Sequence, residues 1–267
     1  MQIDGSLTLI GCGKMGGAML SGWLTQGLSA SQVHLIDPSA DAVAGFVAKG
    51  CHHVAKPPSD SRVVVIAVKP QMMGGALDGL AEQTDGKTLF VSIAAGVTLA
   101  NFRQALGPEA KIVRSMPNTP AAVGRGMTVM VAGAEVGAKD RDLASALLSA
   151  VGETAWVDDE GLLDAVTAVS GGGPAYVFLL AETLAKAGVE AGLPEDLAAR
   201  LARATVAGSG ELLHQAEESP AVLRQNVTSP GGTTLEALKV LMADDGLQPL
   251  LNRAIAAATA RSRELGS

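Results

Sequence analysis

The stretch Leu7-Thr8-Leu9-Ile10-Gly11-Cys12-Gly13-Lys14-Met15-Gly16 decides the fold of this chain. An apolar strand, Leu7–Ile10, runs directly into a G-x-G-x-x-G loop, and a helical stretch, Gly17–Gln26, follows it. In such a loop the first glycine permits a tight turn, the second lets the backbone approach a pyrophosphate, and the third lets the helix pack closely on the strand. The N–H groups at the start of the helix then face the phosphates. We therefore expect a dinucleotide-binding loop here; a structural glycine-rich turn is the alternative.

Apolar strands and helical stretches alternate through the first half of the chain. The strands are rich in Val and Ile, lack polar alternation and are separated by helical stretches such as Asp41–Lys49, a pattern that indicates a parallel sheet covered on both faces. Right-handed connections make such a sheet doubly wound. The predicted strands are Leu7–Ile10, Val33–Ile36, Val63–Val68, Thr88–Ala94, Lys111–Ser115, Met127–Ala132 and Ala155–Val157.

The second part of the chain is expected to be all-α. After about Asp159 no convincing strand follows, and helical spacing appears in Ala175–Ala191, Glu195–Ala216 and Leu235–Met242. The stretch Ala175–Ala191 is apolar on most of its faces, so it requires burial nearly all round. A region of this length hardly surrounds such helices alone, so a partner subunit is the expected cover. We predict a dinucleotide-binding domain over 1–159 and a helical domain for dimerisation and substrate binding over 160–267.

The composition limits the class of protein. With 267 residues, 48% of them apolar and 18% charged, the chain buries a sizeable core and is not disordered. Its net charge of −7 lacks the basic footprint of a nucleic-acid-binding protein. No uninterrupted apolar run approaches about 18 residues, and the N-terminus lacks a signal-peptide pattern. The two cysteines, Cys12 and Cys51, suggest neither a metal site nor a disulfide framework, so we expect a soluble cytoplasmic protein with no membrane or nucleic-acid partner.

Further candidate cofactor contacts follow the predicted strands. Asp37 ends the second strand about 20 residues beyond Gly16, where a carboxylate binds the ribose 2′-OH of NAD and repels a 2′-phosphate. The alternative is a turn in which Ser39 begins a helix. Ligands bind at the carboxyl ends of parallel strands; the loops expected there are 67–71, 92–97 and 115–120. In the first of them, Lys69 faces either a phosphate or solvent.

Two glycine motifs lie in the helical part. The first, Ser170-Gly171-Gly172-Gly173-Pro174, interrupts a helical pattern. In a helix each Gly costs ~1 kcal/mol and Pro ~3 kcal/mol of stability relative to Ala. The motif therefore either has a packing or functional reason or is a plain helix–helix turn. In Ser229–Thr234 the plain interpretation is a helix start, because Thr233 and Glu236 have capping-box spacing. The functional interpretation is a carboxylate-binding site, in which successive backbone N–H groups at the positive end of a helix bind the anion and hydroxyl donors lie beside them.

The sequence contains few other motifs that are typical of catalysis. None of the four histidines has metal-ligand spacing, so no metal site is expected. The chain also lacks a G-x-S-x-G elbow, a Walker loop and an H-E-x-x-H motif. We therefore expect chemistry that needs only a cofactor, orientation and one or two hydrogen bonds.

Six motifs together resemble those of the pyrroline-5-carboxylate reductases, in the same order and spacing nearly end to end. They are GCGKMGGAM (11–19), AVKPQ (67–71), VSIAAGV (91–97), RSMPNTPA (114–121), VSGGGPAYVF (169–178) and VTSPGGTT (227–234). The resemblance implies an α/β protein with an N-terminal Rossmann-type doubly wound parallel sheet and a C-terminal all-α dimerisation domain. It further implies NAD(P)H-dependent reduction of the cyclic imine 1-pyrroline-5-carboxylate to L-proline, the last step of proline biosynthesis, by a homodimer or larger homo-oligomer.

The resemblance also implies roles for individual residues. The backbone N–H groups of Gly231, Gly232 and Thr233 should hold the substrate carboxylate, and Thr234 should hydrogen-bond the ring nitrogen as proton donor or orienter. Ser229 belongs to the same substrate loop, and Glu217 is a further substrate-side candidate. The implied cofactor contacts are Gly11, Cys12, Gly13, Lys14, Met15, Gly16, Asp37, Ser39, Ala67, Val68, Lys69, Pro70, Ala94, Ala95 and Gly96, with Asn226 reaching in from the second subunit.

The sequence leaves alternatives open for the cofactor preference and for the overall activity. The family favours NADP(H), and Ser39 offers a contact for a 2′-phosphate, whereas Asp37 argues for NAD(H). A β-hydroxyacid dehydrogenase of similar build is disfavoured, because that class needs a catalytic lysine on its long helix and 157–185 contains none. A non-catalytic dinucleotide-sensing module is disfavoured by the intact Ser229–Thr234 loop.

Overall fold

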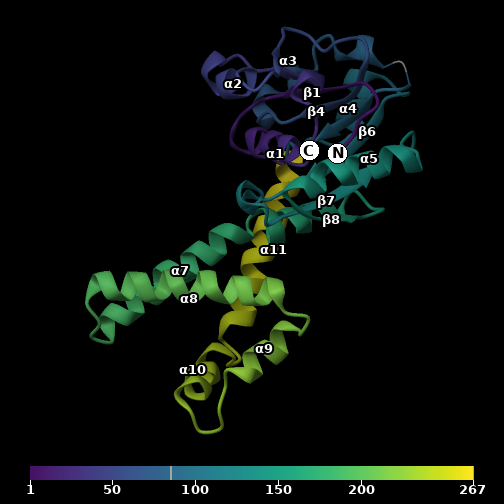
Figure 1. The fold of residues 1–267 in the computed structure, drawn as a ribbon. Coiled ribbons are helices and arrows are strands. Elements are labelled where there is room, and N and C mark those ends of the chain that lie inside the picture. The colour runs from purple at the N-terminus through teal and green to yellow at the C-terminus, as the bar shows by residue number, and fades with distance from the viewer. Residues whose placement is uncertain (85, 267) are drawn as a thin grey trace. The chain divides into compact units, whose positions relative to one another are not determined.

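A computed structural model describes residues 1–84 and 86–266 of the chain, and these form two compact units. The first unit consists of Met1–Gly171 together with the end of the last helix from Ala258 onward, and the second is Gly172–Ala257 (Figure 1). The functional boundary expected between 159 and 160 stays a prediction.

One eight-stranded sheet forms the centre of the first unit, in the order β3-β2-β1-β4-β5-β6-β7-β8. Its strands are β1 Ser6–Ile10, β2 Val33–Ile36, β3 His52–His53, β4 Ser61–Ile66, β5 Leu89–Ser92, β6 Lys111–Met116, β7 Gly126–Ala132 and β8 Gly152–Trp156. The sheet is parallel, as predicted, except that β7 runs antiparallel to β6. The connection between these two strands is too short for a crossover helix, so the chain reverses there. Among the described residues, none after Trp156 lies in a strand.

Both faces of the sheet are buried, because alternate strand residues face opposite layers. On β4, Val63 and Val65 belong to one apolar cluster, whereas Val64 and Ile66 belong to another. The first cluster takes in Met19, Leu20 and Trp23 of α1 (Lys14–Thr25) together with Leu147 of α5 (Ala138–Leu148). The second takes in Met73 of α3 (Met73–Leu77) and Phe102 of α4 (Leu99–Leu106). Two helical layers therefore sandwich the sheet, which explains why its strands lack polar alternation.

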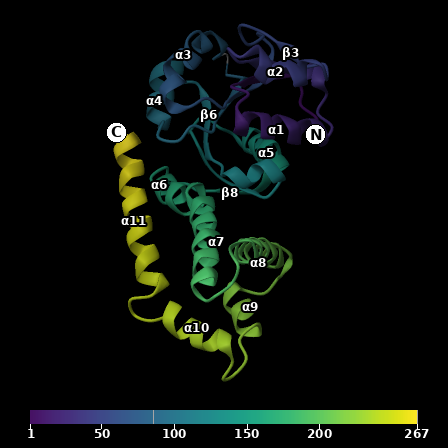
Figure 2. The same cartoon turned by 90° about the vertical axis from the view of Figure 1, so that its left-hand side faces the viewer.

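The helices of the first unit lie between strands, except α6 (Leu162–Val166), which follows β8. They are α1 Lys14–Thr25, α2 Ala40–Val47, α3 Met73–Leu77, α4 Leu99–Leu106, α5 Ala138–Leu148 and α6 Leu162–Val166. Figure 2 shows α3 and α4 on one side of the sheet, with α1 and α5 on the other. With the helices on the two faces of the sheet, loops follow the carboxyl ends of the central strands.

The glycine motif at 170–174 does not break the helical path as strongly as the sequence suggests. After α6 the chain makes a π-helical turn, Thr167–Gly171, and α7 begins at Gly173. The turn packs on the loop after β6: Asn118 Nδ2 donates to Ser170 Oγ at 3.2 Å. A Cβ atom on Gly171 would lie 2.6 Å from Met116 Cε. The glycine therefore serves close packing between these two motifs.

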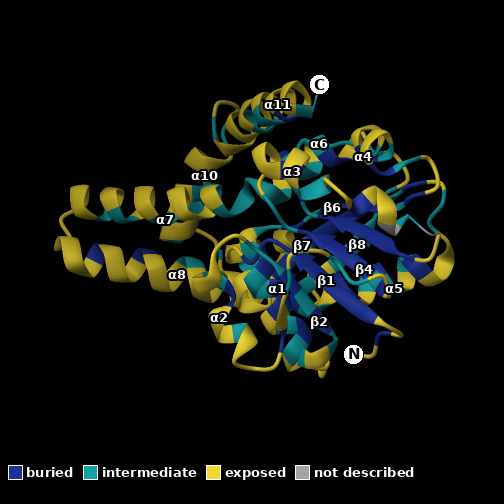
Figure 3. Cartoon of the chain, turned by 90° about the horizontal axis from the view of Figure 1, so that it is seen from above, coloured by how far each residue is buried: buried dark blue, intermediate teal, exposed yellow. Residues whose placement is uncertain are grey.

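The second unit is helical. Its helices are α7 Gly173–Glu190, α8 Glu195–Gln215, α9 Pro220–Asn226, α10 Thr233–Leu241 and the start of α11 Leu247–Gly266. The helices α7 and α8 pack together where Gly188 meets Ala198. The all-round burial predicted for α7 does not occur within one chain: none of its residues is buried, and Phe178 is 68% exposed. Figure 3 shows this contrast with the dark blue strands of the first unit.

One stretch of the described residues, Leu162–Glu190, is long and apolar enough to cross a membrane by length and composition alone. Only 11% of its most apolar window is buried inside the chain. Such a surface needs a cover from outside the single chain.

Candidate functional site

Three loops leave the sheet side by side at its carboxyl edge. The N–H groups of Gly11, Ala67 and Ile93 donate to the last residues of the neighbouring strands, Ile36, Ile10 and Ile66, at 2.8, 2.7 and 3.1 Å. These bonds extend the sheet by one step and align the starts of the loops. The predicted cofactor segments 11–16, 67–70 and 94–96 therefore begin next to one another, as expected for a ligand site of this kind of sheet.

Each glycine of the G-x-G-x-x-G loop has a separate structural reason. Gly11 has a φ of +96°, and a Cβ atom there would lie 2.7 Å from the carbonyl oxygen of Ala67. A Cβ atom on Gly16 would lie 2.1 Å from the carbonyl oxygen of Gly11, so only glycine lets α1 pack this close to β1. At Gly13, by contrast, a Cβ atom would meet nothing within 4 Å. The space beside Gly13 is free for a ligand.

The start of α1 offers unpaired donors. Gly13 is the N-cap of this helix and makes no side-chain cap. Within the described part of the chain, the N–H groups of Gly13, Lys14 and Met15 donate no hydrogen bond. Unpaired N–H groups at a positive helix end favour an anion such as a pyrophosphate.

The Asp37 carboxylate is fixed against the glycine loop. One oxygen accepts the Cys12 N–H at 2.7 Å, and the other accepts the Ser39 N–H at 2.8 Å. Ser39 in turn caps α2, because its Oγ accepts the Ala42 N–H at 3.3 Å. Both interpretations of Asp37 are compatible with this geometry, because the side chain orders a turn and Asp37 also lines the cleft beside the loop. Its bond to Cys12 is a contact that spacing in the sequence does not reveal.

A cleft of about 600 Å³ lies beside these loops. Among the predicted residues it is lined by Gly11, Gly13, Asp37, Ala67, Val68 and Lys69. Cys12, Lys14, Met15, Gly16, Ser39, Pro70 and the 94–96 segment do not line it directly. Its other lining residues are Ile10, Ile36, Pro38, Met72, Gly75 and Ala76. No sequence signal marks the last three, because they reach the cleft only once α3 has folded after β4.

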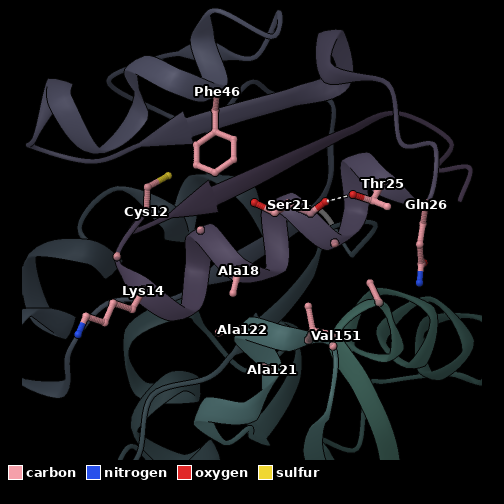
Figure 4. Close-up of a pocket in the computed structure, with 15 residues that line it drawn as sticks. Cys12, Lys14, Ala18, Ser21, Thr25, Gln26, Phe46, Ala121, Ala122 and Val151 are labelled. Atoms are coloured by element: carbon pink, nitrogen blue, oxygen red, sulfur yellow. Dashed lines mark hydrogen bonds between the residues drawn. The ribbon is translucent and has the colours of Figure 1, made fainter.

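A second groove, of about 710 Å³, runs along α1 (Figure 4). Small residues of α1, among them Ala18, form one wall, and Ala121, Ala122 and Val151 form another. Cys12 lines this groove, but its side chain is only 6% exposed. Burial, together with the nearby charge of Asp37, raises the pKa of the Cys12 thiol to about 12. The thiol therefore stays protonated and is not a nucleophile at neutral pH.

The predicted substrate loop lies in the second unit, between α9 and α10. Gly232 is the N-cap of α10 and Thr233 its first residue, so the capping box between Thr233 and Glu236 does not form. The N–H of Gly232 donates to the Ser229 carbonyl at 3.0 Å and closes a turn. The N–H groups of Gly231, Thr233 and Thr234 donate no hydrogen bond to any residue that the structure describes.

The other two predicted contacts are also in this unit. Glu217 is exposed between α8 and α9, and Asn226 is the last residue of α9. The cofactor residues of the first unit and the substrate residues of the second thus belong to separate compact bodies.

Comparison with known proteins covers both units. Residues 160–265 match the family described as pyrroline-5-carboxylate reductase dimerisation, and residues 6–96 match NADP oxidoreductase, coenzyme F420-dependent. The chain is 41% identical to a pyrroline-5-carboxylate reductase of Pseudomonas aeruginosa, over 97% of this chain and 96% of that one.

Two solved structures have the same fold. A pyrroline-5-carboxylate reductase from Coxiella burnetii is 34% identical, with a TM-score of 0.93 over 99% of this chain and 100% of that one. The pyrroline carboxylate reductase from Plasmodium falciparum, solved with NADP bound, is 28% identical, with a TM-score of 0.80 over 99% of each chain.

Proposed function

This chain belongs to the pyrroline-5-carboxylate reductase family, and on that premise we propose how its residues reduce 1-pyrroline-5-carboxylate to L-proline. The reaction is the last step of proline biosynthesis, and the protein is an NAD(P)H-dependent oxidoreductase. The observation that carries the residue-level proposal is the loop before α10, where unpaired N–H groups and a threonine hydroxyl share one helix end.

The glycine loop fits a dinucleotide. The pyrophosphate lies against the unpaired N–H groups of Gly13, Lys14 and Met15, in the space that the missing side chain of Gly13 leaves. The segments Ala67–Pro70 and Ala94–Gly96 continue the site along the strand ends. When bound, the reduced nicotinamide supplies the hydride that reaches the imine carbon.

The substrate carboxylate binds the loop before α10. Gly231 and Thr233 donate their N–H groups, and the positive end of α10 favours the negative charge. The Gly232 N–H, which the resemblance also gives to the carboxylate, donates to the Ser229 carbonyl at 3.0 Å, so Gly232 serves the turn and is not a free donor. Ser229 closes the turn that presents these donors.

Thr234 acts on the ring nitrogen. Its hydroxyl hydrogen-bonds this nitrogen and either orients the ring or donates a proton as the imine is reduced. An iminium is already an electrophile, so one well-placed hydrogen bond is sufficient and no strong acid is required. Glu217 is the further substrate-side contact.

The fixed carboxylate of Asp37 sets the cofactor preference. The protein accepts NADP(H), as its family does, but Asp37 also lets it use NAD(H), because the carboxylate accepts a hydrogen bond from a 2′-OH and repels a 2′-phosphate. Ser39 offers its hydroxyl to a 2′-phosphate. Asp37 is held in place by Cys12 and by Ser39, so it does not easily turn away.

A second copy of the chain covers the apolar faces of α7 and α8. Both helices lie within the segment that matches the dimerisation family. That match supports a protein partner rather than lipid as the cover of Leu162–Glu190. In the resulting homodimer Asn226 contacts the cofactor bound by the other subunit. We assign the enzyme to the cytoplasm.

The decisive experiment is oxidation of NADPH and of NADH by the purified protein on addition of 1-pyrroline-5-carboxylate, with proline measured as product. Turnover that yields proline is expected with both cofactors. Dinucleotide binding without turnover would instead favour a sensing module, and turnover of a β-hydroxyacid would favour the dehydrogenase alternative.

A further inference from the structure

The loop between β5 and α4, residues 93–98, is held at Gly96 and directly after its last residue, at Leu99, by residues far away in the sequence. It carries the segment Ala94–Gly96, to which the proposed function gives a cofactor role. The N–H groups of Ala95, Gly96 and Val97 donate no hydrogen bond among the residues described. A loop with free donors needs supports elsewhere to keep a single conformation.

The first support is Glu160, in the turn before α6. Its Oε1 accepts the N–H of Leu99, the first residue of α4, at 2.8 Å. The same oxygen accepts Arg114 Nη1 of β6 at 2.7 Å. The Arg114 side chain is 8% exposed, so this ion pair is largely shielded from solvent and well fixed. A carboxylate at this position also complements the positive end of α4.

The second support is the last turn of α11. Gly96 has a φ of +75°, and a Cβ atom on it would lie 3.2 Å from the carbonyl oxygen of Leu265. This turn is anchored to α6, because Ser262 Oγ donates to Asp164 Oδ1 at 2.7 Å. Arg263 lies 3.8 Å from the other oxygen of Asp164. The end of α11 thus rests against Gly96 and is bonded to Asp164, in the helix that directly follows the turn containing Glu160.

We propose that Glu160 and the last turn of α11 are positioning elements for the cofactor loop Ala94–Gly96. This inference rests on the proposed function of that loop. Glu160 and Leu265 are also the first and last residues of the segment matched by the dimerisation family. That segment therefore supplies, besides the substrate loop, the two supports of the cofactor loop Ala94–Gly96.

The test measures dinucleotide affinity without substrate, from the fluorescence of bound NADH or NADPH, next to steady-state kinetics. Glu160→Ala is expected to raise the dissociation constant of the reduced dinucleotide at least about fivefold. The KM for 1-pyrroline-5-carboxylate at saturating dinucleotide stays within about twofold. Glu160→Gln regains most of the affinity, since its amide oxygen still accepts the Leu99 N–H. Ser262→Ala gives a smaller change in the same direction.

Two further variants separate positioning from stability. Glu160→Ala leaves the buried Arg114 guanidinium without its partner. The double variant Arg114→Met/Glu160→Ala removes that guanidinium, so its melting temperature recovers while its dinucleotide affinity stays low. Glu135→Ala is the matched control: Glu135 pairs with Arg103 at 2.7 Å and is 27% exposed, against 29% for Glu160, but no bond joins Glu135 to residues 93–99.

Two results would overturn the proposal. One is a dinucleotide affinity of Glu160→Ala within twofold of the wild type. The other is recovery of affinity together with stability in the double variant, which would make Glu160 a purely structural residue. Absence of proline formation by the wild-type enzyme would instead refute the proposed function, and the affinity measurements would stand apart from it.

Discussion

The carboxylate of Asp37 accepts the backbone N–H of Cys12 at 2.7 Å and so joins the end of β2 to the glycine loop. A residue expected to bind the ribose therefore also holds the glycine loop in place. The charge of Asp37 is expected to act on cofactor choice, whereas its hydrogen bond holds the glycine loop. Substitutions can separate these two roles.

Replacing Asp37 tests the charge alone. Asp37→Asn keeps an oxygen that accepts the Cys12 N–H but removes the negative charge that opposes a 2′-phosphate. We expect the ratio of kcat/KM for NADPH to that for NADH to rise about tenfold, which corresponds to roughly 1.4 kcal/mol. Asp37→Ala loses the bond as well and weakens the binding of both cofactors. An unchanged ratio in Asp37→Asn would remove Asp37 from cofactor selection.

Two glycines of the same loop should respond in opposite ways. Gly16→Ala places a methyl group 2.1 Å from the carbonyl oxygen of Gly11, so it should destabilise the fold by about 1–3 kcal/mol, seen as a lower melting temperature. Gly13→Val meets no protein atom near its Cβ, so it should fold normally yet lose dinucleotide binding through steric block. Retained affinity in Gly13→Val would refute the placement of the pyrophosphate.

Thr234 can be tested separately from the cofactor. Thr234→Ala should lower turnover at least several-fold, because it removes the proposed hydrogen bond to the ring nitrogen, while dinucleotide affinity stays nearly unchanged. Thr234→Ser keeps the hydroxyl and should restore most of the rate. Equal rates for the alanine variant and the wild type would exclude Thr234 from the mechanism.

The exposed face of α7 predicts the oligomeric state. Phe178, which is 68% exposed in the single chain, becomes buried if a second copy covers the helix. Phe178→Asp should therefore lower the mass measured by sedimentation towards that of a monomer. Val123→Asp is the control, because Val123 is 76% exposed but lies in the first unit. A monomeric wild type, or an intact oligomer in the Phe178 variant, would contradict the proposed interface.

The Cys12 thiol should be inert at neutral pH. Its pKa is raised to about 12, so the reactive thiolate appears only as the pH rises towards that value. Alkylation by iodoacetamide at pH 8, mapped by mass spectrometry, should be at least about a hundredfold slower at Cys12 in the native protein than in the unfolded chain. Cys12→Ala should keep its turnover, since the residue serves the loop through its backbone N–H.

The sequence predicted most of the first unit, because its signals are local. The run Leu7–Gly16 contains the strand, the turn glycines and the helix start within one short segment, and steric rules give each glycine its place. The apolar strands were likewise found within a few residues of their observed ends. The reversal of β7 was missed because periodicity gives no strand direction.

Helix starts were less predictable. The spacing of Thr233 and Glu236 fits a capping box with Thr233 as N-cap, yet the helix begins one residue earlier than that motif requires, with Gly232 as N-cap. The propensities of neighbouring residues differ too little to fix a helix end to one position, and the turn closed by Ser229 decides it.

By itself the sequence determined the fold class, the dinucleotide loop and the family, since each depends on residue types at fixed short spacings. Only the tertiary structure decided what supports the loops. The bonds from Asp37 to Cys12 and from Glu160 to Leu99 join residues 25 and 61 positions apart. No local pattern encodes such pairs, because their partners meet only when the sheet has formed and the helices have packed on it.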